Sequence, residues 1–188
     1  MAAKVSQGVT TVVAGNCGIS LAPFPEGIEL PVTPPLDLLD EAGVWFRFPT
    51  MAAYVEELRT RPPAANAVLL VGHTTLRVVT MDDLERPATA AELARMRALA
   101  HEALAAGAAG ISTGLYYEPA AAAPTEEVIE VCRPLSEFGA LYCTHMRNEA
   151  EQVLDSLEES FRIGRELGVG VVISHHKVNG VENYGRSR

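Results

Sequence analysis

Three residues whose side chains can bind a metal ion each follow a short segment rich in β-branched residues. Cys17 lies in the run GNCG (15–18), His145 in THMR (144–147) and His175 in SHHK (174–177). A thiolate and two imidazoles suit zinc, and a catalytic zinc keeps three protein ligands and one position open for water. In parallel β/α folds, functional residues lie at the carboxyl ends of the strands. We therefore predict that Cys17, His145 and His175 form a metal site.

The same three residues also have a purely structural interpretation. A free cysteine is commonly a small buried residue, and histidines are often accommodated by packing alone. No local ligand pair of the Cys-x-x-Cys type strengthens the metal interpretation. From spacing alone, both interpretations stay open.

Alternating strands and helices are predicted to position these residues. The strands are expected at residues 9–14, 67–72, 110–114, 140–144 and 169–174. Helices are expected at 51–60, from a capping box of Thr89 and Glu92 to Gly107, at 124–138, and at 149–167, where Val153, Leu157 and Phe161 recur every four residues. Residues 20–50 contain six prolines and are expected to form a long loop after the Cys17 strand. This alternation predicts a parallel sheet with helices outside it, an α/β fold.

Composition limits the classes of protein that need consideration. The 188 residues are 48% hydrophobic, which is enough for one core, and no 18-residue apolar run predicts a membrane span. The net charge of −9, with scattered arginines, argues against nucleic acid as a partner. Three cysteines cannot all pair, and no signal core follows the first residues, so a cytoplasmic location is expected.

Four segments form an ordered set of longer motifs. They are GVTTVVAGNCG (8–18), GISTGL (110–115), THMRNE (144–149) and ISHHK (173–177). Together they resemble the D-aminoacylase (N-acyl-D-amino-acid deacylase) branch of the amidohydrolase superfamily. The resemblance implies a TIM-type (β/α)8 barrel, of which residues 1–188 would supply about five parallel strands, the second to the sixth, with outer helices, truncated at both ends. It also implies that Cys17, His145 and His175 bind zinc.

The resemblance further implies a reaction. The expected activity is hydrolysis of the amide of a small N-acyl-D-amino acid to a carboxylate and the free D-amino acid. Zinc would lower the pKa of its bound water, and a carboxylate base would move the proton. By the family pattern this base is an Asp after the last barrel strand, beyond Arg188, and the family's His-x-His pair is not found before Cys17. No carboxylate of this chain is expected to act as the base, since Glu118 and Glu149 each precede or open a loop or helix.

Three residues resemble family positions that bind substrate. Lys177, expected on the same side of the last strand as His175, would bind the substrate carboxylate; otherwise it is a solvated lysine. Tyr117 would donate a hydrogen bond to a developing oxyanion, or else it packs. Arg147 would assist at the mouth of the site, or else it pairs with Glu149 or Glu151. His73, at the end of a predicted strand, is a further candidate for lining the pocket.

Two other functions remain open. A cyclic-amide amidohydrolase of the dihydroorotase type is disfavoured because such enzymes commonly bridge two metals with a modified lysine on the fourth strand, and residues 110–115 contain no lysine. Alternatively, the chain as it stands is non-catalytic, with at most weak metal binding or an interaction role. The acyl group, the D-amino-acid side chain and the oligomeric state are not predicted.

Overall fold

Five parallel strands form one curved sheet in the computed structural model, which describes residues 2–29, 36 and 44–187. The strands are β1 (Thr11–Ala14), β2 (Asn66–Gly72), β3 (Gly110–Gly114), β4 (Leu141–His145) and β5 (Val171–Ile173). Their order in the sheet follows the sequence, β1-β2-β3-β4-β5, and every neighbouring pair is parallel. The predicted α/β class and the five parallel strands are confirmed, with strand ends that differ by one or two residues.

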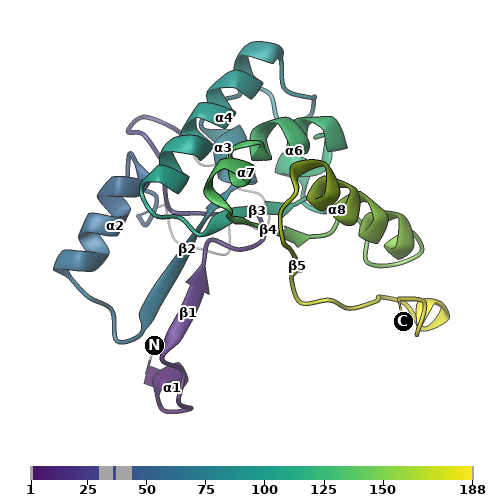
Figure 1. Cartoon of the computed structure of the whole chain (residues 1–188), viewed down its shortest axis with the longest axis horizontal. Coiled ribbons are helices and arrows are strands. Elements are labelled where there is room, and N and C mark those ends of the chain that lie inside the picture. Colours follow the sequence, from purple (N-terminus) through teal and green to yellow (C-terminus); the bar gives the residue numbers. More distant parts are fainter. Residues whose placement is uncertain (1, 30–35, 37–43, 188) are drawn as a thin grey trace.

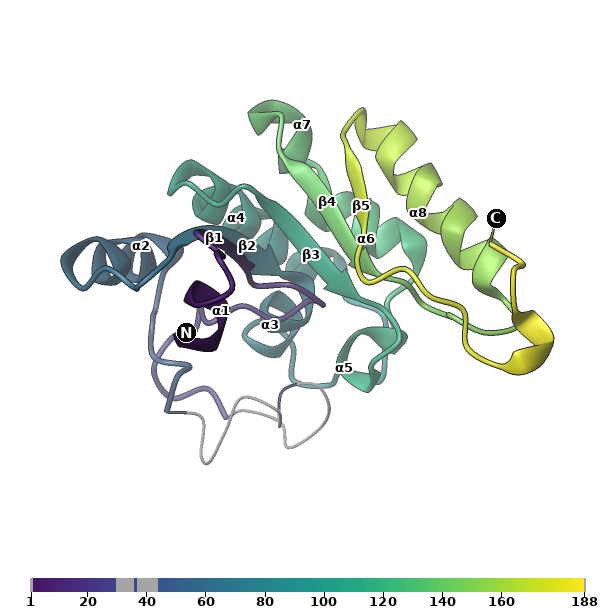
Figure 2. The same ribbon diagram turned by 90° about the horizontal axis from the view of Figure 1, so that it is seen from below.

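Helices cover the outer side of this sheet (Figures 1 and 2). They are α2 (Met51–Thr60), α3 (His73–Val78), α4 (Ala90–Ala105), α5 (Glu118–Ala121), α6 (Thr125–Cys132), α7 (Pro134–Phe138) and α8 (Val153–Leu167). Helix α1 (Ala2–Val5) precedes β1 and buries no residue, and a short 3-10 helix, Val181–Asn183, follows β5 near the C-terminus. The predicted capping box is present, since the Thr89 and Glu92 side chains cap the start of α4 reciprocally. No helix among the described residues is long and apolar enough to cross a membrane.

The strand register separates two faces of the sheet. Successive side chains of a strand point to opposite faces of the sheet. The outer face carries Leu69, Val71, Ile111 and Tyr142, which are buried against the helices in the main core. The other face is concave and carries four exposed apolar side chains, followed by His145 at its carboxyl end. These exposed residues are Val13, Val68, Leu141 and Val172. The sheet is therefore a curled part of a barrel whose inner face is open.

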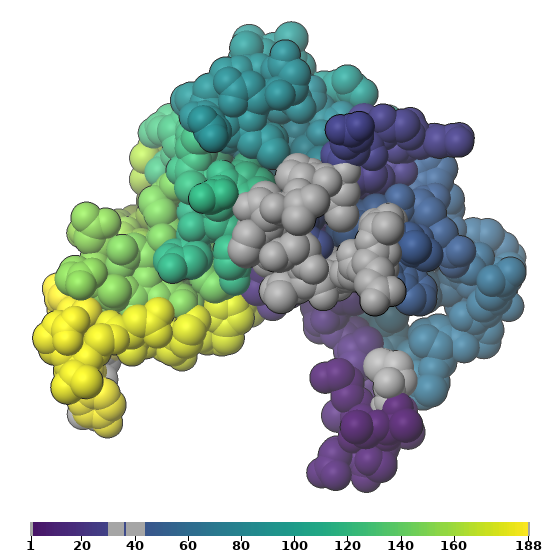
Figure 3. Space-filling model, turned by 180° about the vertical axis from the view of Figure 1, so that it is seen from behind, coloured from purple at the N-terminus to yellow at the C-terminus, as the bar shows by residue number. Residues whose placement is uncertain are grey.

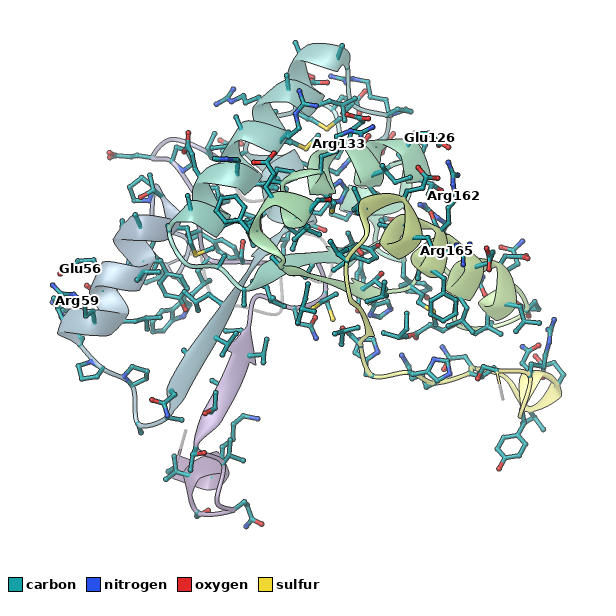
Figure 4. The ribbon with its side chains drawn as sticks, in the orientation of Figure 1. Glu56, Arg59, Glu126, Arg133, Arg162 and Arg165 are labelled. Carbon is teal, nitrogen blue, oxygen red and sulfur yellow. The ribbon has the colours of Figure 1, made fainter. Side chains whose placement is uncertain are left out.

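The N-terminal and C-terminal segments project from the same side of the molecule. In the space-filling view they form two separate legs, purple and yellow (Figure 3). The outer helices carry exposed ion pairs, among them Arg59–Glu56 at 2.9 Å and Arg162–Glu126 at 3.1 Å (Figure 4). The outer surface is thus charged and solvated, while the inner face is apolar.

Several predicted helices needed correction. The single helix expected at 124–138 is two helices, α6 and α7, because Pro134 lacks an N–H and its ring clashes with the carbonyl four residues earlier. Helix α8 begins at Val153 rather than residue 149, since the Asn148 side chain accepts the backbone N–H groups of Ala150 and Gln152 and holds a turn there. The helices α3 and α5 were not predicted.

The four-residue series of α8 is buried at Val153 and half-buried at Leu157, but not at Phe161. Residues spaced by four advance about 40° around a helix at each step, so a strict four-residue series drifts out of the buried stripe. Accordingly Phe161 is 44% exposed. The buried residues of α8 are Val153, Ser156, Ser160, Ile163, Gly164 and Leu167.

The proline-rich loop after Cys17 packs back onto the fold. Its described residues between 20 and 50 form no α-helix or strand, as predicted, and the remainder of that prediction, 30–35 and 37–43, lies outside the described residues. Phe24, Leu36 and Phe46 form a second small core with Val78 and Val79, which follow β2. The loop therefore covers the side of the molecule next to α3.

Candidate metal centre

The three predicted metal-binding residues lie together at the carboxyl ends of the strands. The Cys17 Sγ atom lies 3.4 Å from His175 Nε2, and the rings of His145 and His175 meet edge to face with centroids 4.5 Å apart. One donor atom from each of Cys17, His145 and His175 lies within 4.8 Å of the others. Cys17 follows β1, His145 ends β4, and His175 follows β5. The sheet thus brings together side chains that are 158 residues apart.

A strained turn places the Cys17 thiol. Cys17 has a φ of 54°, in the left-handed region that non-glycine residues rarely adopt. The Ser112 hydroxyl from β3 secures this turn, since its Oγ accepts the Gly18 N–H at 3.1 Å and donates to the Gly15 carbonyl at 2.5 Å. A Cβ on Gly18 would lie 2.5 Å from Thr74 Oγ1 and 2.8 Å from the Gly114 nitrogen, so only glycine fits there. Neighbouring strands therefore fix the thiol.

A second turn places His175. The chain leaves β5 at Ile173, and His175 has a φ of 38°. Just before it, the Ser174 hydroxyl donates to Asn16 Oδ1 at 3.0 Å, which ties the loop after β5 to the loop after β1. Because β5 ends at Ile173 and residues 174–175 form a turn, His175 and Lys177 do not lie on a strand as expected. Lys177 nevertheless reaches the cluster, with Nζ 3.5 Å from His175 Nδ1.

A buried carboxylate that the sequence analysis set aside completes the cluster. Glu149 is 5% exposed and lies in the turn after β4. Its Oε1 is 3.5 Å from His175 Nδ1, its Oε2 is 3.7 Å from His145 Nε2, and Oε2 also forms an ion pair with Lys177. The signal for it was its position four residues after His145, in the loop that leaves the same strand. We call Cys17, His145, Glu149, His175 and Lys177 the strand-end cluster.

The other predicted site residues have different positions. The Tyr117 hydroxyl lies 3.3 Å from His145 Nδ1, so Tyr117 borders the cluster. The Arg147 guanidinium instead binds Glu159 and the carbonyls of Ala121 and Ala123, which disfavours its predicted role at the mouth and replaces its expected pairing with Glu149 or Glu151.

His73 does not line this site. It begins α3, is fully buried, and lies beside Glu127 at 3.4 Å. Sequence reasoning placed it at a strand end correctly but did not foresee that the chain turns directly into a helix there. Its imidazole is therefore part of a separate buried cluster.

Burial favours the uncharged forms of Cys17 and His145. Burial, with a further contribution from the Glu149 charge, raises the pKa of the Cys17 thiol above its usual range. Burial also lowers the pKa of His145, with the Glu149 charge acting in the opposite direction, so this imidazole is neutral near pH 7. Burial likewise raises the pKa of Tyr117, so its hydroxyl keeps its proton and can donate a hydrogen bond.

These properties fit a divalent cation with a preference for sulfur and nitrogen donors. Two such donors around a tetrahedral zinc ion lie roughly 3.5 Å apart, and Cys17 Sγ and His175 Nε2 are separated by 3.4 Å. Neutral imidazoles are the form that binds metals, and a cation at the cluster would favour the thiolate that burial disfavours. Cys17, His145 and His175 therefore fit zinc by donor type, and the Cys17–His175 pair also fits by distance, while all three donor atoms lie within 4.8 Å of one another.

The fold and this cluster define a class, and similar solved structures agree with it. A structure described as "Crystal structure of D-aminoacylase defines a novel subset of amidohydrolases" superposes with a TM-score of 0.92 at 62% identity, over 98% of this chain and 38% of that one. A zinc- and phosphonate-bound N-acyl-D-glutamate deacylase from Bordetella bronchiseptica gives a TM-score of 0.90 at 43% identity, with the same coverage. This chain is thus part of an amidohydrolase (β/α) barrel.

Sequence comparison identifies the family within that class. The chain is 61% identical over all 188 residues to a D-aminoacylase, and 55% identical to an N-acyl-D-aspartate deacylase, both from Alcaligenes xylosoxydans xylosoxydans. The chain belongs to the D-aminoacylase family. It spans 38% and 37% of the lengths of these two relatives, and no family model matches it.

Proposed function

We propose that this chain is a segment of a zinc-dependent hydrolase that cleaves the amide of N-acyl-D-amino acids. The observation that supports this most directly is the meeting of a thiol and two imidazoles at the carboxyl ends of three parallel strands. The identity to D-aminoacylase over the full chain supports the substrate class. Cys17, His145 and His175 would hold the zinc ion, which when bound supplies a water of lowered pKa and polarises a carbonyl group.

The chain's own residues would bind and orient the substrate around this centre. Tyr117 keeps its proton and borders His145, so its hydroxyl can donate to an oxygen that becomes negatively charged. The Lys177 side chain is 47% exposed, so its ammonium can bind the carboxylate of an amino acid while it remains paired with Glu149. Arg147 is a weaker candidate for substrate binding, because its guanidinium is engaged by Glu159.

The base would come from outside residues 1–188. The strand-end cluster itself contains one carboxylate, Glu149, and its Oε2 is engaged by Lys177. An Asp in a later part of a longer protein, as the family resemblance implies, remains our proposal for the group that accepts the proton from water. A small molecule is the proposed substrate, and three unpaired cysteines support a cytoplasmic location.

A cyclic-amide amidohydrolase is the second candidate. The observation against it is that β3, which lies beside the strand of His145, contains no lysine to bridge two metals. The lysine is absent from Gly110–Gly114, which is the whole of β3.

Turnover of paired substrates tests the proposal. We expect the full-length protein that contains this segment to hydrolyse N-acetyl-D-amino acids, to ignore the L-enantiomers, and to lose activity on chelation with recovery on zinc addition. Dihydroorotate serves as the cyclic-amide comparison. Full activity after verified zinc removal, or hydrolysis of dihydroorotate alone, would refute it.

A Cys17→Ala variant tests the centre directly. It removes a metal donor, so zinc binding should weaken by more than the ~10–100-fold typical of losing a contact to a ligand. Cys132→Ala is the matched control, because Cys132 is fully buried in the helix-side core. Equal zinc affinity in the two variants would show that Cys17 is not a metal ligand.

A further inference from the structure

Glu149 is the buried group of the strand-end cluster to which the proposed chemistry gives no role. Its side chain is 4% exposed, yet it lies among two imidazoles and an ammonium. A carboxylate this deeply buried is stable only when other groups replace its lost hydration. Its neighbours therefore indicate what it does.

The two oxygens of Glu149 differ in their contacts. Oε2 pairs with the Lys177 ammonium and lies 3.7 Å from His145 Nε2. Oε1 has no hydrogen-bond partner among the described residues, and His175 Nδ1 lies 3.5 Å from it. An acceptor left unsatisfied in a buried site destabilises the protein, and an N–H at His175 Nδ1 is the group best placed to satisfy it.

That proton would fix which nitrogen of His175 faces the metal donors. An imidazole with its proton on Nδ1 leaves a lone pair on Nε2, and Nε2 is the atom that contacts Cys17 Sγ at 3.4 Å. Carboxylates commonly hold metal-binding histidines in this way. Lys177 Nζ is also 3.5 Å from Nδ1, but the ammonium already has Glu149 Oε2 as its acceptor.

We propose that Glu149 is the positioning residue that couples the metal ligand His175 to the substrate-binding Lys177. One carboxylate oxygen orients His175 through Nδ1, and the other holds the Lys177 ammonium at the rim of the site. This inference rests on the proposed function for the roles of zinc and Lys177. It adds that metal affinity and binding of the substrate carboxylate share one residue.

The backbone of Glu149 has a separate structural role. Its carbonyl accepts the Asn179 N–H at 2.6 Å, which anchors the segment after His175. Because this bond involves no side-chain atom, a substitution of the Glu149 side chain leaves it in place. Glu149→Gln also keeps the side-chain volume. It can therefore distinguish an effect on the positions of His175 and Lys177 from an effect on folding.

The test compares variants of the full-length protein that contains this segment. Glu149→Gln should weaken zinc binding ~10–100-fold, as loss of an outer contact to a metal ligand usually does, and should also raise the KM for an N-acyl-D-amino acid. Lys177→Met should raise KM while leaving zinc affinity at the parent level. Glu149→Asp, which keeps the charge, should recover part of both losses.

Glu127→Gln is the matched control. Glu127 is 3% exposed and pairs with Arg77, so it shares the burial and charge of Glu149 but lies outside the cluster. It should lower stability without changing zinc affinity or KM. Glu149→Gln behaving like Glu127→Gln would reduce Glu149 to a structural residue and overturn the proposal.

A measurement without zinc distinguishes failure of this inference from failure of the proposed function. In ¹⁵N spectra of the metal-free protein, with the His175 signals assigned by their loss in His175→Ala, the parent should carry the His175 proton on Nδ1. Glu149→Ala should shift that proton toward Nε2. Absence of zinc binding by the parent would refute the proposed function, whereas an unchanged His175 tautomer in Glu149→Ala would refute the role of Glu149.

Discussion

Two clusters in this molecule combine histidine, a buried glutamate and a cationic side chain, and they differ in how exposed their other members are. The strand-end cluster holds Glu149 and Lys177. The second, which we call the α3–α6 cluster, consists of His73, Arg77 and Glu127. His73 and Arg77 are both 0% exposed, whereas the side chains of His175 and Lys177 are 41% and 47% exposed. Similar residue types are thus enclosed in one place and accessible in the other.

In the α3–α6 cluster, Arg77 and Glu127 are held by many local partners, although both ring nitrogens of His73 lack a hydrogen-bond partner among the described residues. Arg77 donates to the carbonyls of Pro119, Leu84 and Arg86 and pairs with Glu127, which also accepts the Ala88 N–H at 2.8 Å. These bonds join α3, α5, α6 and the segment before α4. The cluster therefore fixes elements relative to one another.

The strand-end cluster keeps accessible donors. Cys17 is partly exposed, and the side chains of His175 and Lys177 are exposed to 41% and 47%. The comparison teaches that a buried Glu–His pair does not by itself mark a functional site. Accessible donor atoms at the carboxyl ends of strands distinguish the candidate site from the structural cluster.

The largest expected effect comes from isolating the strand-end cluster. Residues 1–188 alone should hydrolyse N-acetyl-D-amino acids ~10²–10⁴-fold more slowly than the full-length protein, even when loaded with zinc, because the proposed base lies elsewhere. The open apolar inner face, with Val13 at 60% exposure, should also make the isolated chain associate. Turnover assays with light scattering measure both; parent-like turnover from a monodisperse chain would point to Glu118 or Glu149 as the base.

The second largest effect is expected from a substitution that breaks the α3–α6 cluster. Arg77→Met leaves Glu127 buried without its main partner, so the free energy of unfolding should fall by about 3–5 kcal/mol. Arg162→Met is the control, because Arg162 forms exposed pairs with Glu126 and Glu166 that are worth about 0–1 kcal/mol. Denaturant titration measures both. Zinc affinity should be unchanged in either folded variant, and a loss of zinc binding in Arg77→Met would mean that the two clusters are not independent.

The α3–α6 cluster should also make the free energy of unfolding depend on pH. Although burial opposes ionisation, the contacts of Glu127 with His73, Ala88 and Arg77 lower its pKa to about 2, against ~4.3 for an unfolded chain. A carboxyl group with a lowered folded-state pKa stabilises the protein above the unfolded value, and that contribution disappears as the pH falls from about 4 to 2. Glu127→Gln should flatten the unfolding free energy over this range. Identical slopes for parent and variant would contradict the assignment.

The smallest effect concerns the bond between the two site loops. Ser174→Ala removes the hydroxyl that binds Asn16 and should cost about 0.5–1.5 kcal/mol of stability. Ser136→Ala is a matched control, because the Ser136 hydroxyl donates to the Leu167 carbonyl away from the site. Both should lower stability similarly in thermal unfolding, but only Ser174→Ala should weaken zinc binding. Equal zinc affinities would show that the loops hold their positions without this bond.

Much of the scaffold and the three donor residues could be predicted, because both depend on local patterns. β-branched runs mark the strands, and parallel strands bring their carboxyl ends to one edge, which is sufficient to bring Cys17, His145 and His175 together. The position of Glu149 four residues after His145 was a signal, but its contacts with His175 and Lys177 could not be predicted, since they depend on how the turn after β4 folds. The pairing of Arg147 with Glu159 depends on the placement of α8, which has no local signature. The break at Pro134 was readable from its chemistry and was missed because the apolar spacing continued through it.

The link between the loops after β1 and β5 has a consequence for the order of folding. Cys17 and His175, like Asn16 and Ser174, are separated by 158 residues. Contacts of such high sequence separation carry a large loop-closure entropy and form late, after the local β/α units. The donors therefore meet only when all five strands are in register. Metal uptake would then report that folding of this segment is complete, and an ion bound there would stabilise the folded segment by mass action.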